Sequence, residues 1–255
     1  MIVYDLFPIQ FPDWVVPEFT REFTEALDAI VPIADRIVTL SAQVADLVAG
    51  RYPEVSSRVS VGVPTLKAHA PSILAQGTET EPPAPVLGPF LFALSTVEPR
   101  KNHRVILDAW RLARRDPRLS EAWLVIAGRH GWKTDDIEAE IARDARPLQI
   151  LRLSSSTDAE VAALYRDCIA TIHASWAEGF GLPARESVVR GIPTIMSSTI
   201  PTDGLPVGTY RSFDPSDADG LASLMVEAIV GGRVRTPVEL GEGTGWEPVL
   251  SALLD

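Results

Sequence analysis

Two glutamates and two glycines share one short stretch of this chain. Residues 175–186 read Ser-Trp-Ala-Glu-Gly-Phe-Gly-Leu-Pro-Ala-Arg-Glu and follow an apolar run with the character of a strand. Pro183 is typical of the first turn of a helix, so the stretch predicts a strand, a loop and a helix start. Free amides and the helix dipole favour a phosphate at such a loop. Glu178 and Glu186 would be acceptors for sugar hydroxyls; the alternative is a tight turn with two solvated glutamates.

A cationic pair lies in a second stretch of the same kind. Arg100 and Lys101 follow the apolar run Phe90–Thr96 and precede a predicted helix. Ligands of open α/β sheets bind beyond the carboxyl ends of the strands, where this pair would lie. The segments 124–132 and 198–202 end or follow strands at the same edge. Four loops are therefore predicted to converge on one crevice, in which the two cations serve a phosphate group.

The elements that must position these loops alternate between strand and helix from residue 89 onward. Runs that are apolar throughout predict strands of a parallel sheet covered on both faces. Thr157 and Glu160 form a capping box that begins one of the helices between them. The alternation predicts a doubly wound α/β domain. The predicted strands are Phe90–Thr96, Trp123–Ala127, Gln149–Leu153, Ile169–Ala174 and Pro193–Ser197, and the predicted helices lie near 103–115, 134–145, 157–167, 183–190 and 216–230.

A proline-rich stretch precedes this domain. Residues 65–89 hold five prolines and two glycines, which is typical of a linker. We therefore predict a partial N-terminal domain at 1–64, a linker at 65–88 and a second domain at 89–255. The N-terminal part is predicted to hold the strands Ile2–Leu6, Arg36–Leu40 and Arg58–Val61 with helices near 17–31 and 41–49. Three strands and two helices would make an incomplete sheet.

Composition narrows the class of protein. The net charge is −11 and no segment supplies a concentrated basic face, which argues against nucleic-acid binding. The longest apolar runs are far shorter than a membrane span, and the first residues lack the pattern of a signal peptide. A cytoplasmic location follows, with peripheral contact at the inner membrane face as an open alternative. The single cysteine, Cys168, is predicted to be a buried packing residue, so neither a disulfide nor a cysteine-based metal site is available.

In order and spacing, four motifs resemble the C-terminal domain of family-four retaining glycosyltransferases, the glycosyl transferases group 1, which have the two-domain GT-B fold. The resemblance covers residues 89–255 and reaches back to 4–8 and 34–41, which look like the latter half of that family's N-terminal domain. The motifs are Ser-Thr-Val-Glu-Pro-Arg-Lys-Asn at 95–102, Ala-Gly-Arg-His-Gly-Trp at 127–132, Ser-Trp-Ala-Glu-Gly-Phe-Gly-Leu-Pro at 175–183 and Arg-Gly-Ile-Pro-Thr at 190–194.

The resemblance implies transfer of a sugar from a nucleoside diphosphate sugar to a saccharide or lipid-linked acceptor, with the anomeric configuration kept and no metal or other cofactor required. Arg100 and Lys101 would bind the donor diphosphate and offset the charge on the leaving group. Glu178, the third implied catalytic residue, would hold the donor sugar. The other implied donor-binding residues are Glu186 at the ribose hydroxyls, Gly179, Phe180 and Gly181 through their amides, and Leu182, Gly128 and His130.

Two departures from the family pattern stand beside this resemblance. Tyr4 takes the place where many members carry a histidine that faces the donor sugar, and Ile200-Pro-Thr-Asp203 replaces a Leu-Pro-Glu sequence. The family's first strands and glycine-rich loop have no counterpart before residue 1. We therefore expect the chain to self-associate through its N-terminal sheet or to be completed by a second polypeptide.

Two rival hypotheses stay open: a non-catalytic nucleotide-sugar-binding subunit or degenerate paralogue, and a nucleotide-sugar epimerase.

A short acidic motif has a structural interpretation. Asp217 and Asp219 match the short acidic motif that binds a metal in the other major glycosyltransferase fold, but they open the last predicted helix of the second domain. We predict that they cap it. The glycine-rich run at 241–245 is predicted to be a loop, and the histidines have no ligand-like spacing.

Overall fold

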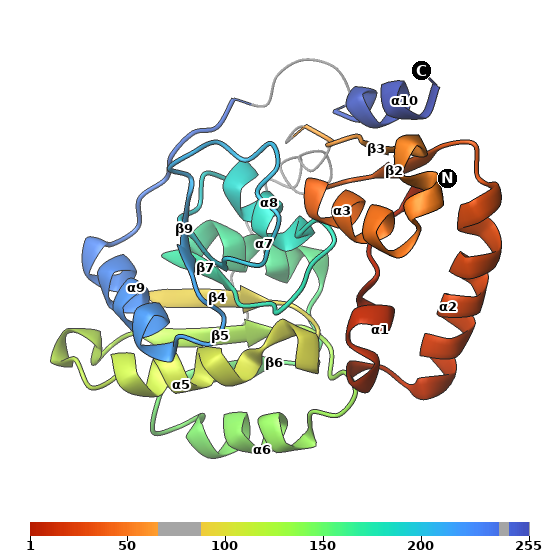
Figure 1. The fold of residues 1–255 in the computed structure, drawn as a ribbon. Coiled ribbons are helices and arrows are strands. Elements are labelled where there is room, and N and C mark those ends of the chain that lie inside the picture. The colour runs from red at the N-terminus through yellow and green to blue at the C-terminus, as the bar shows by residue number, and fades with distance from the viewer. Residues whose placement is uncertain (66–87, 240–244, 255) are drawn as a thin grey trace.

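Two parallel β-sheets organise the chain (Figure 1). The computed structural model describes residues 1–65, 88–239 and 245–254. The larger sheet has the strand order β6-β5-β4-β7-β8-β9, with every neighbouring pair parallel. Its strands are β4 (Phe90–Leu94), β5 (Trp123–Ala127), β6 (Ile150–Leu153), β7 (Ala170–His173), β8 (Thr194–Ser197) and β9 (Tyr210–Phe213). The doubly wound parallel sheet predicted from the sequence is confirmed.

The edge strand β9 was not predicted. Its sequence, Tyr-Arg-Ser-Phe, carries two exposed polar residues in the middle. An edge strand is covered on fewer sides than a central one, so it need not be apolar throughout, and the pattern that identified the five other strands is absent from it.

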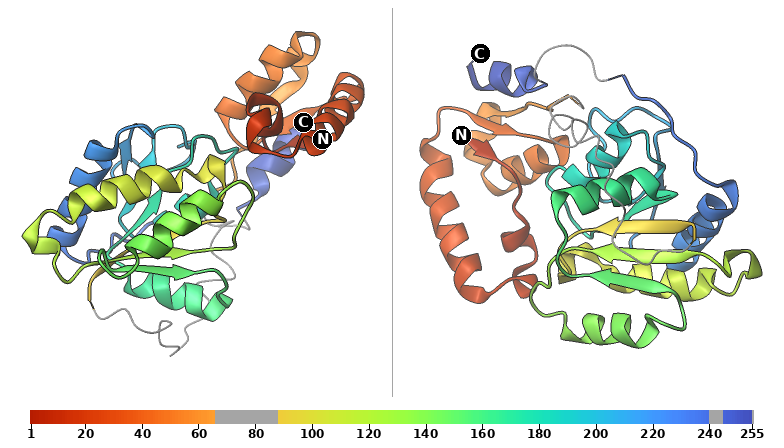
Figure 2. Two further views of the ribbon diagram at one scale, coloured as in Figure 1. Left: turned by 90° about the horizontal axis from the view of Figure 1, so that it is seen from below. Right: turned by 180° about the vertical axis from the view of Figure 1, so that it is seen from behind.

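Helices cover both faces of this sheet, as the views in Figure 2 show. Leu91 and Ala93 of β4 belong to the core that packs under α5, α6 and α9, whereas Phe90 and Phe92 pack with Leu164 of α7. Successive side chains of a strand point to opposite faces, so one apolar strand serves both layers. The helices are α5 (His103–Ala113), α6 (Asp135–Asp144), α7 (Asp158–Asp167), α8 (Leu182–Val189) and α9 (Ala218–Gly231). All five were predicted, and the capping box of Thr157 and Glu160 is present at α7.

The order of the strands creates a switch point between β4 and β7. From β4 the chain moves through β5 to β6 at one edge, and it then returns to β7 on the other side of β4. The loops that leave β4 and β7 therefore turn to opposite faces of the sheet. A crevice forms outside the carboxyl ends of strands at such a point. Arg100 and Lys101 follow β4, and Glu178 follows β7.

The smaller sheet has the order β1-β2-β3 and is also parallel. The predicted strand Ile2–Leu6 is shorter than expected, because a short helix with Pro8 in its first turn follows at once. Ser41 caps α3 by accepting a hydrogen bond from the amide of Val44. The elements are β1 (Ile2–Val3), α1 (Phe7–Gln10), α2 (Pro17–Ile30), β2 (Ile37–Thr39), α3 (Ala42–Arg51) and β3 (Val59–Val61), with short 3₁₀ turns between them.

A last helix, α10 (Glu247–Leu254), packs against β2 and β3 of the smaller sheet, as Figure 1 shows. Val249 is buried there with Val38, Leu40 and Phe180. The sequence predicted no helix in this region. Most of the predicted linker, and the glycine-rich loop except Gly245, lie outside the described residues.

Candidate functional site

The crevice at the switch point brings Arg100, Lys101 and Glu178 into direct contact. The Lys101 ammonium lies 2.5 Å from one oxygen of the Glu178 carboxylate, and the Arg100 guanidinium lies 2.8 Å from the other. The three side chains are only 12–13% exposed. Both cations belong to a single 3₁₀ turn, η5 (Pro99–Lys101), that follows β4. The sequence predicted that the loops carrying these residues converge on one crevice. In the structure, the Glu178 carboxylate itself pairs with both cations.

The ionisation of Glu178 reflects two opposing effects. Burial alone would raise the pKa of its carboxyl group, but the charges of Lys101 and Arg100 outweigh burial and hold the pKa below its usual value. The Ser175 hydroxyl also donates a hydrogen bond to this carboxylate at 2.6 Å. Glu178 is therefore a buried carboxylate ion that three donors stabilise.

Glu98 is a second carboxylate in contact with Arg100. Its oxygen lies 2.7 Å from the guanidinium, and its side chain is only 6% exposed. The guanidinium also donates to the carbonyl of Ala177 and stacks over the ring of Phe7 at 4.5 Å. The Nε of Arg100 is buried and has no hydrogen-bond partner among the described residues. Sequence reasoning gave Glu98 no role, although it lies two positions before Arg100 in the motif.

The loop after β7 packs closely against residues of the smaller sheet. A Cβ atom on Gly179 would lie 2.0 Å from the carbonyl oxygen of Tyr4, so only glycine fits there. The Ser41 hydroxyl donates to the Gly179 carbonyl at 2.7 Å. Phe180 is buried, with the guanidinium of Arg185 at 3.6 Å from its ring centre. Tyr4 contacts this loop through its backbone while its side chain stays 58% exposed, which a histidine at the same place would also permit.

Glu186 lies apart from this cluster. It is on α8, where the Tyr165 hydroxyl donates to it at 3.5 Å. Burial raises the pKa of its carboxyl, although Arg190 and Tyr165 act in the opposite direction. Gly181 has a φ of +76° before α8, and Leu182 is 49% exposed.

The segment after β5 approaches β4 closely. Gly128 has a φ of +138°, and a Cβ there would lie 2.0 Å from the carbonyl oxygen of Ser95. His130 is 48% exposed, and its two ring nitrogens lie 3.4 Å from oxygens of Asp135 and Glu138. These acidic side chains belong to the start of α6, so His130 is beside the helix rather than beside Glu178.

Small cavities border the Glu178 side chain. One of about 10 Å³ is lined by Lys101, Ser175 and Glu178, and another of about 60 Å³ is lined by Asp5, Gln43 and Glu178. A ligand pocket for a molecule the size of a drug measures roughly 300–1,000 Å³. The crevice must therefore rearrange to admit a large ligand.

Two larger cavities lie elsewhere. The one of about 470 Å³ is lined by Glu98, Asn102 and Trp176, on the α5 side of Arg100. The one of about 280 Å³ includes Gly191 and Thr194, at the amino ends of the strands, away from the ion pairs.

The chain was compared with known proteins. Residues 81–206 match the family described as Glycosyl transferases group 1. The serotype-specific mannosyltransferase WbdA of Escherichia coli is 28% identical over 208 residues, which cover 76% of this chain and 25% of that protein. The O-antigen chain mannosyltransferase B of Escherichia coli is 28% identical over 136 residues, 53% of this chain and 35% of that protein.

Solved structures share the fold. Sucrose-phosphate synthase from Thermosynechococcus elongatus has a TM-score of 0.66 at 20% identity and matches 98% of this chain and 62% of its own. HepE from Anabaena, in complex with UDP and glucose, has a TM-score of 0.65 at 17% identity and matches 89% and 61%.

Residues 81–206 are a glycosyl transferases group 1 domain. The fold is of the GT-B type, with the larger sheet as its Rossmann-like domain. The chain spans about a quarter of the length of the curated WbdA relatives that it matches.

Other polar residues of the part of the chain built on the larger sheet have structural roles. Asp217 caps α9 by accepting from the amide of Gly220 at 2.8 Å, as predicted. Cys168 is fully buried, also as predicted. Burial lowers the pKa of both His103 and His173 to about 3, so both are neutral. Within residues 1–65, 88–239 and 245–254, no group of three or more His, Cys, Asp or Glu is arranged to hold a metal ion, and no helix is long and apolar enough to cross a membrane.

Proposed function

We propose that the glycosyl transferases group 1 domain binds a nucleoside diphosphate sugar at the β4–β7 crevice. In the whole protein, it then transfers the sugar to an acceptor hydroxyl with retention of the anomeric configuration. The observation that supports this most is the meeting of Arg100, Lys101 and Glu178 at the carboxyl ends of two adjacent strands. Two buried cations on one turn suit a diphosphate, and a carboxylate beside them suits sugar hydroxyls.

The chemistry rests on positioning and charge. As the bond between the sugar and the diphosphate breaks, negative charge grows on the leaving phosphate, and Arg100 and Lys101 would stabilise it there. Glu178 is tied to both cations and to Ser175, which suits a hydrogen-bond acceptor for the sugar rather than a free nucleophile. Glu186 would accept hydrogen bonds from the ribose, since within the described part of the chain its carboxylate accepts only from the Tyr165 hydroxyl, at 3.5 Å.

The donor sugar is proposed to be a hexose. Two curated relatives are mannosyltransferases, and HepE was solved with UDP and glucose. We propose a saccharide or lipid-linked acceptor, because one relative is an O-antigen chain mannosyltransferase. A cytoplasmic site of action, at or near the inner membrane face, agrees with this kind of acceptor.

Calorimetry and product analysis test the proposal. The chain should bind UDP or GDP, and a labelled nucleotide sugar incubated with acceptor should give a labelled glycoside of unchanged anomeric configuration. Binding without product would favour a non-catalytic subunit, and a labelled epimer of the donor would favour an epimerase. No binding of either nucleotide would overturn the proposal.

We further propose that the smaller sheet associates with more polypeptide, either a second copy or a separate chain. β1 pairs on one side only within the described sheet, and unpaired strand edges favour association. Phe19 of α2 and Ile33 after it are 47% and 79% exposed. Light scattering on the purified chain checks this: a monodisperse monomer that transfers sugar would contradict it.

A further inference from the structure

Arg100 lies between two glutamates that differ in their surroundings. Glu98 contacts it from within the same turn, at 2.7 Å, and Glu178 contacts it from the loop after β7, at 2.8 Å. Both carboxylates are buried, with exposed fractions of 6% and 12%. Proximity to the guanidinium therefore does not distinguish them, and their other contacts must.

The two carboxylates border different cavities. Glu178 lines both small cavities of the crevice, one shared with Lys101 and the other with Asp5. Glu98 instead lines the larger cavity on the α5 side. A ligand that enters between the smaller sheet and the β7 loop meets Glu178 first, and Arg100 separates it from Glu98.

The charges of the cluster already balance. Arg100 and Lys101 supply two positive charges, and their ion-pair partners Glu98 and Glu178 supply two negative ones. Asp5 lines a cavity with Glu178 and adds no cation; burial raises the pKa of its carboxyl. A diphosphate adds further negative charge to a site whose side chains are largely buried, where an unpaired charge is costly. A diphosphate can bind both cations only if one carboxylate gives up its ion pairs.

Glu178 is the carboxylate that can leave. It retains the Ser175 hydroxyl as a donor, and a sugar bound beside the diphosphate would bring further hydroxyl donors. Among the described residues, the Glu98 carboxylate pairs only with Arg100. The backbone carbonyl of Glu98 accepts a hydrogen bond from the amide of Lys101 at 3.0 Å, so Glu98 is built into the turn that carries both cations.

We propose that a donor diphosphate displaces Glu178 from Lys101 and Arg100, while Glu98 stays paired with Arg100 and positions its guanidinium. This proposal rests on the proposed function of the crevice. The freed Glu178 carboxylate then accepts hydrogen bonds from the sugar. Diphosphate and sugar therefore bind cooperatively. The diphosphate frees the Glu178 carboxylate for the sugar, and the sugar hydroxyls replace the cations that Glu178 loses to the diphosphate.

Proton uptake is the distinctive consequence. In the empty site, the two cations hold the pKa of Glu178 low against the effect of burial. Once they pair with phosphate, burial and the nearby anion raise this pKa, so a diphosphate without a sugar should bind together with a proton. A nucleotide sugar should take up less, because its hydroxyls stabilise the carboxylate ion.

The first experiment is calorimetry with pyrophosphate and UDP, in two buffers of different ionisation enthalpy near pH 6. Wild type should take up more protons than Glu178→Gln, a comparison that also accounts for protons exchanged by the ligand and by Asp5, the other carboxyl of this cavity. The variant should bind pyrophosphate about tenfold more tightly, since roughly one charged hydrogen bond need no longer be broken. Glu227→Gln is the matched control, because this surface glutamate is 63% exposed and distant in sequence from both loops. It should behave as wild type does.

A double-mutant cycle tests Glu98. Glu98→Gln should weaken pyrophosphate binding about threefold when Arg100 is present and leave it unchanged in an Arg100→Ala background, because Glu98 acts through Arg100. A residue that acted on the ligand through its charge alone would change affinity in both backgrounds, and this result would overturn the positioning role.

The outcomes separate the exchange from the function on which it rests. If wild type binds UDP or pyrophosphate but Glu178→Gln shows no gain in affinity and the same proton uptake, the exchange is wrong and the donor site stands. If wild type binds neither pyrophosphate nor UDP nor GDP, both proposals fall together.

Discussion

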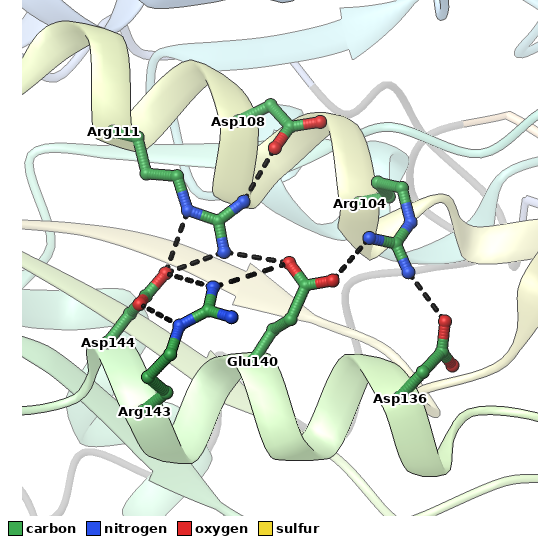
Figure 3. A network of polar contacts seen from close by, with 7 residues as sticks. All are labelled: Arg104, Asp108, Arg111, Asp136, Glu140, Arg143 and Asp144. Atoms are coloured by element: carbon green, nitrogen blue, oxygen red, sulfur yellow. Dashed lines mark hydrogen bonds and ion pairs between the residues drawn. The ribbon is translucent and has the colours of Figure 1, made fainter.

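The ion pairs of Arg100 and Lys101 in the crevice and a second set of ion pairs are built from the same residue types in different surroundings. The second set joins α5 to α6 along the outside of the domain (Figure 3). Arg111 alone contacts three carboxylates there, of Asp108, Glu140 and Asp144. The whole network consists of Arg104, Asp108, Arg111, Asp136, Glu140, Arg143 and Asp144.

The two clusters differ in burial and in how their hydrogen bonds are satisfied. Arg104 and Asp136 of the network are 47% and 66% exposed, so water can replace either partner. In the crevice, Arg100 is 13% exposed and its Nε has no partner among the described residues. A partner lost from the network is replaced by solvent, whereas one lost from the crevice leaves a buried charge. The same kind of ion pair is therefore a minor contact at the surface and one that is costly to break in the crevice.

The largest effect should come from Arg100→Ala. It would leave Glu98 buried without its cation and deprive Glu178 of one, and loss of one partner from a buried pair costs about 3–5 kcal/mol of the free energy of unfolding. Urea denaturation followed by tryptophan fluorescence measures this. Arg104→Ala is the matched network variant and should cost no more than about 1 kcal/mol. Equal losses would erase the contrast between the clusters.

Lys101→Ala should weaken binding of the diphosphate by about 1.5–3 kcal/mol, the usual range for a hydrogen bond to a charged group. Calorimetry with UDP and GDP measures this loss. Lys133→Ala provides a lysine control, because its ammonium donates to the carbonyl of Asp13 and not to the crevice carboxylates. Unchanged affinity in the Lys101 variant would remove this residue from the donor site.

Acid should affect Glu140 of the network and Glu186 of α8 in opposite directions. Hydrogen bonds from Arg111 and Arg104 hold the pKa of Glu140 below its ordinary value of 4.5. Its stabilising contribution is therefore full above about pH 4.5 and is lost as the pH falls through the lower, folded-state pKa. Glu140→Gln should flatten the loss of stability between pH 6 and 3 by about 1 kcal/mol.

Glu186 should change the pH dependence of stability in the opposite direction. Burial raises the pKa of its carboxyl, so the folded state takes up a proton before the unfolded state and gains stability as the pH falls. Glu186→Gln should therefore steepen the loss of stability on acidification. If Glu140→Gln and Glu186→Gln shift the pH profile in the same direction, the difference assigned to their surroundings is wrong.

The smallest effect is expected at the rim of the network. Arg143 is 64% exposed and contacts Asp144, which keeps Arg111 as a partner. Arg143→Ala should change the free energy of unfolding by less than about 0.5 kcal/mol, measured in the same urea experiment. A loss above about 1.5 kcal/mol would show that the network acts as one unit and not as separate surface pairs.

Local pattern by itself determined the helices and most strands of the larger domain. The apolar runs at 90–96 and 123–127 and the capping box at Thr157 depend on neighbours within a few residues, so they could be identified without tertiary contacts. β9 and α10 lack such a pattern and were missed. The middle residues of β9 are exposed and polar, and α10 is stabilised by contacts with the smaller sheet, which is distant in sequence.

The sequence also predicted that Arg100, Lys101 and Glu178 lie at one edge of the larger sheet, because the strand ends that carry them had to share that edge. Only the tertiary structure decided which of the charged side chains form ion pairs with one another. Lys101 and Glu178 are 77 positions apart in the sequence, so no local rule predicts their contact. The burial of Glu98 and the packing of Tyr4 against Gly179 likewise depend on how the layers meet. The balance of charges in this largely buried site is a property of that packing, so the sequence alone could not predict the exchange proposed for Glu178.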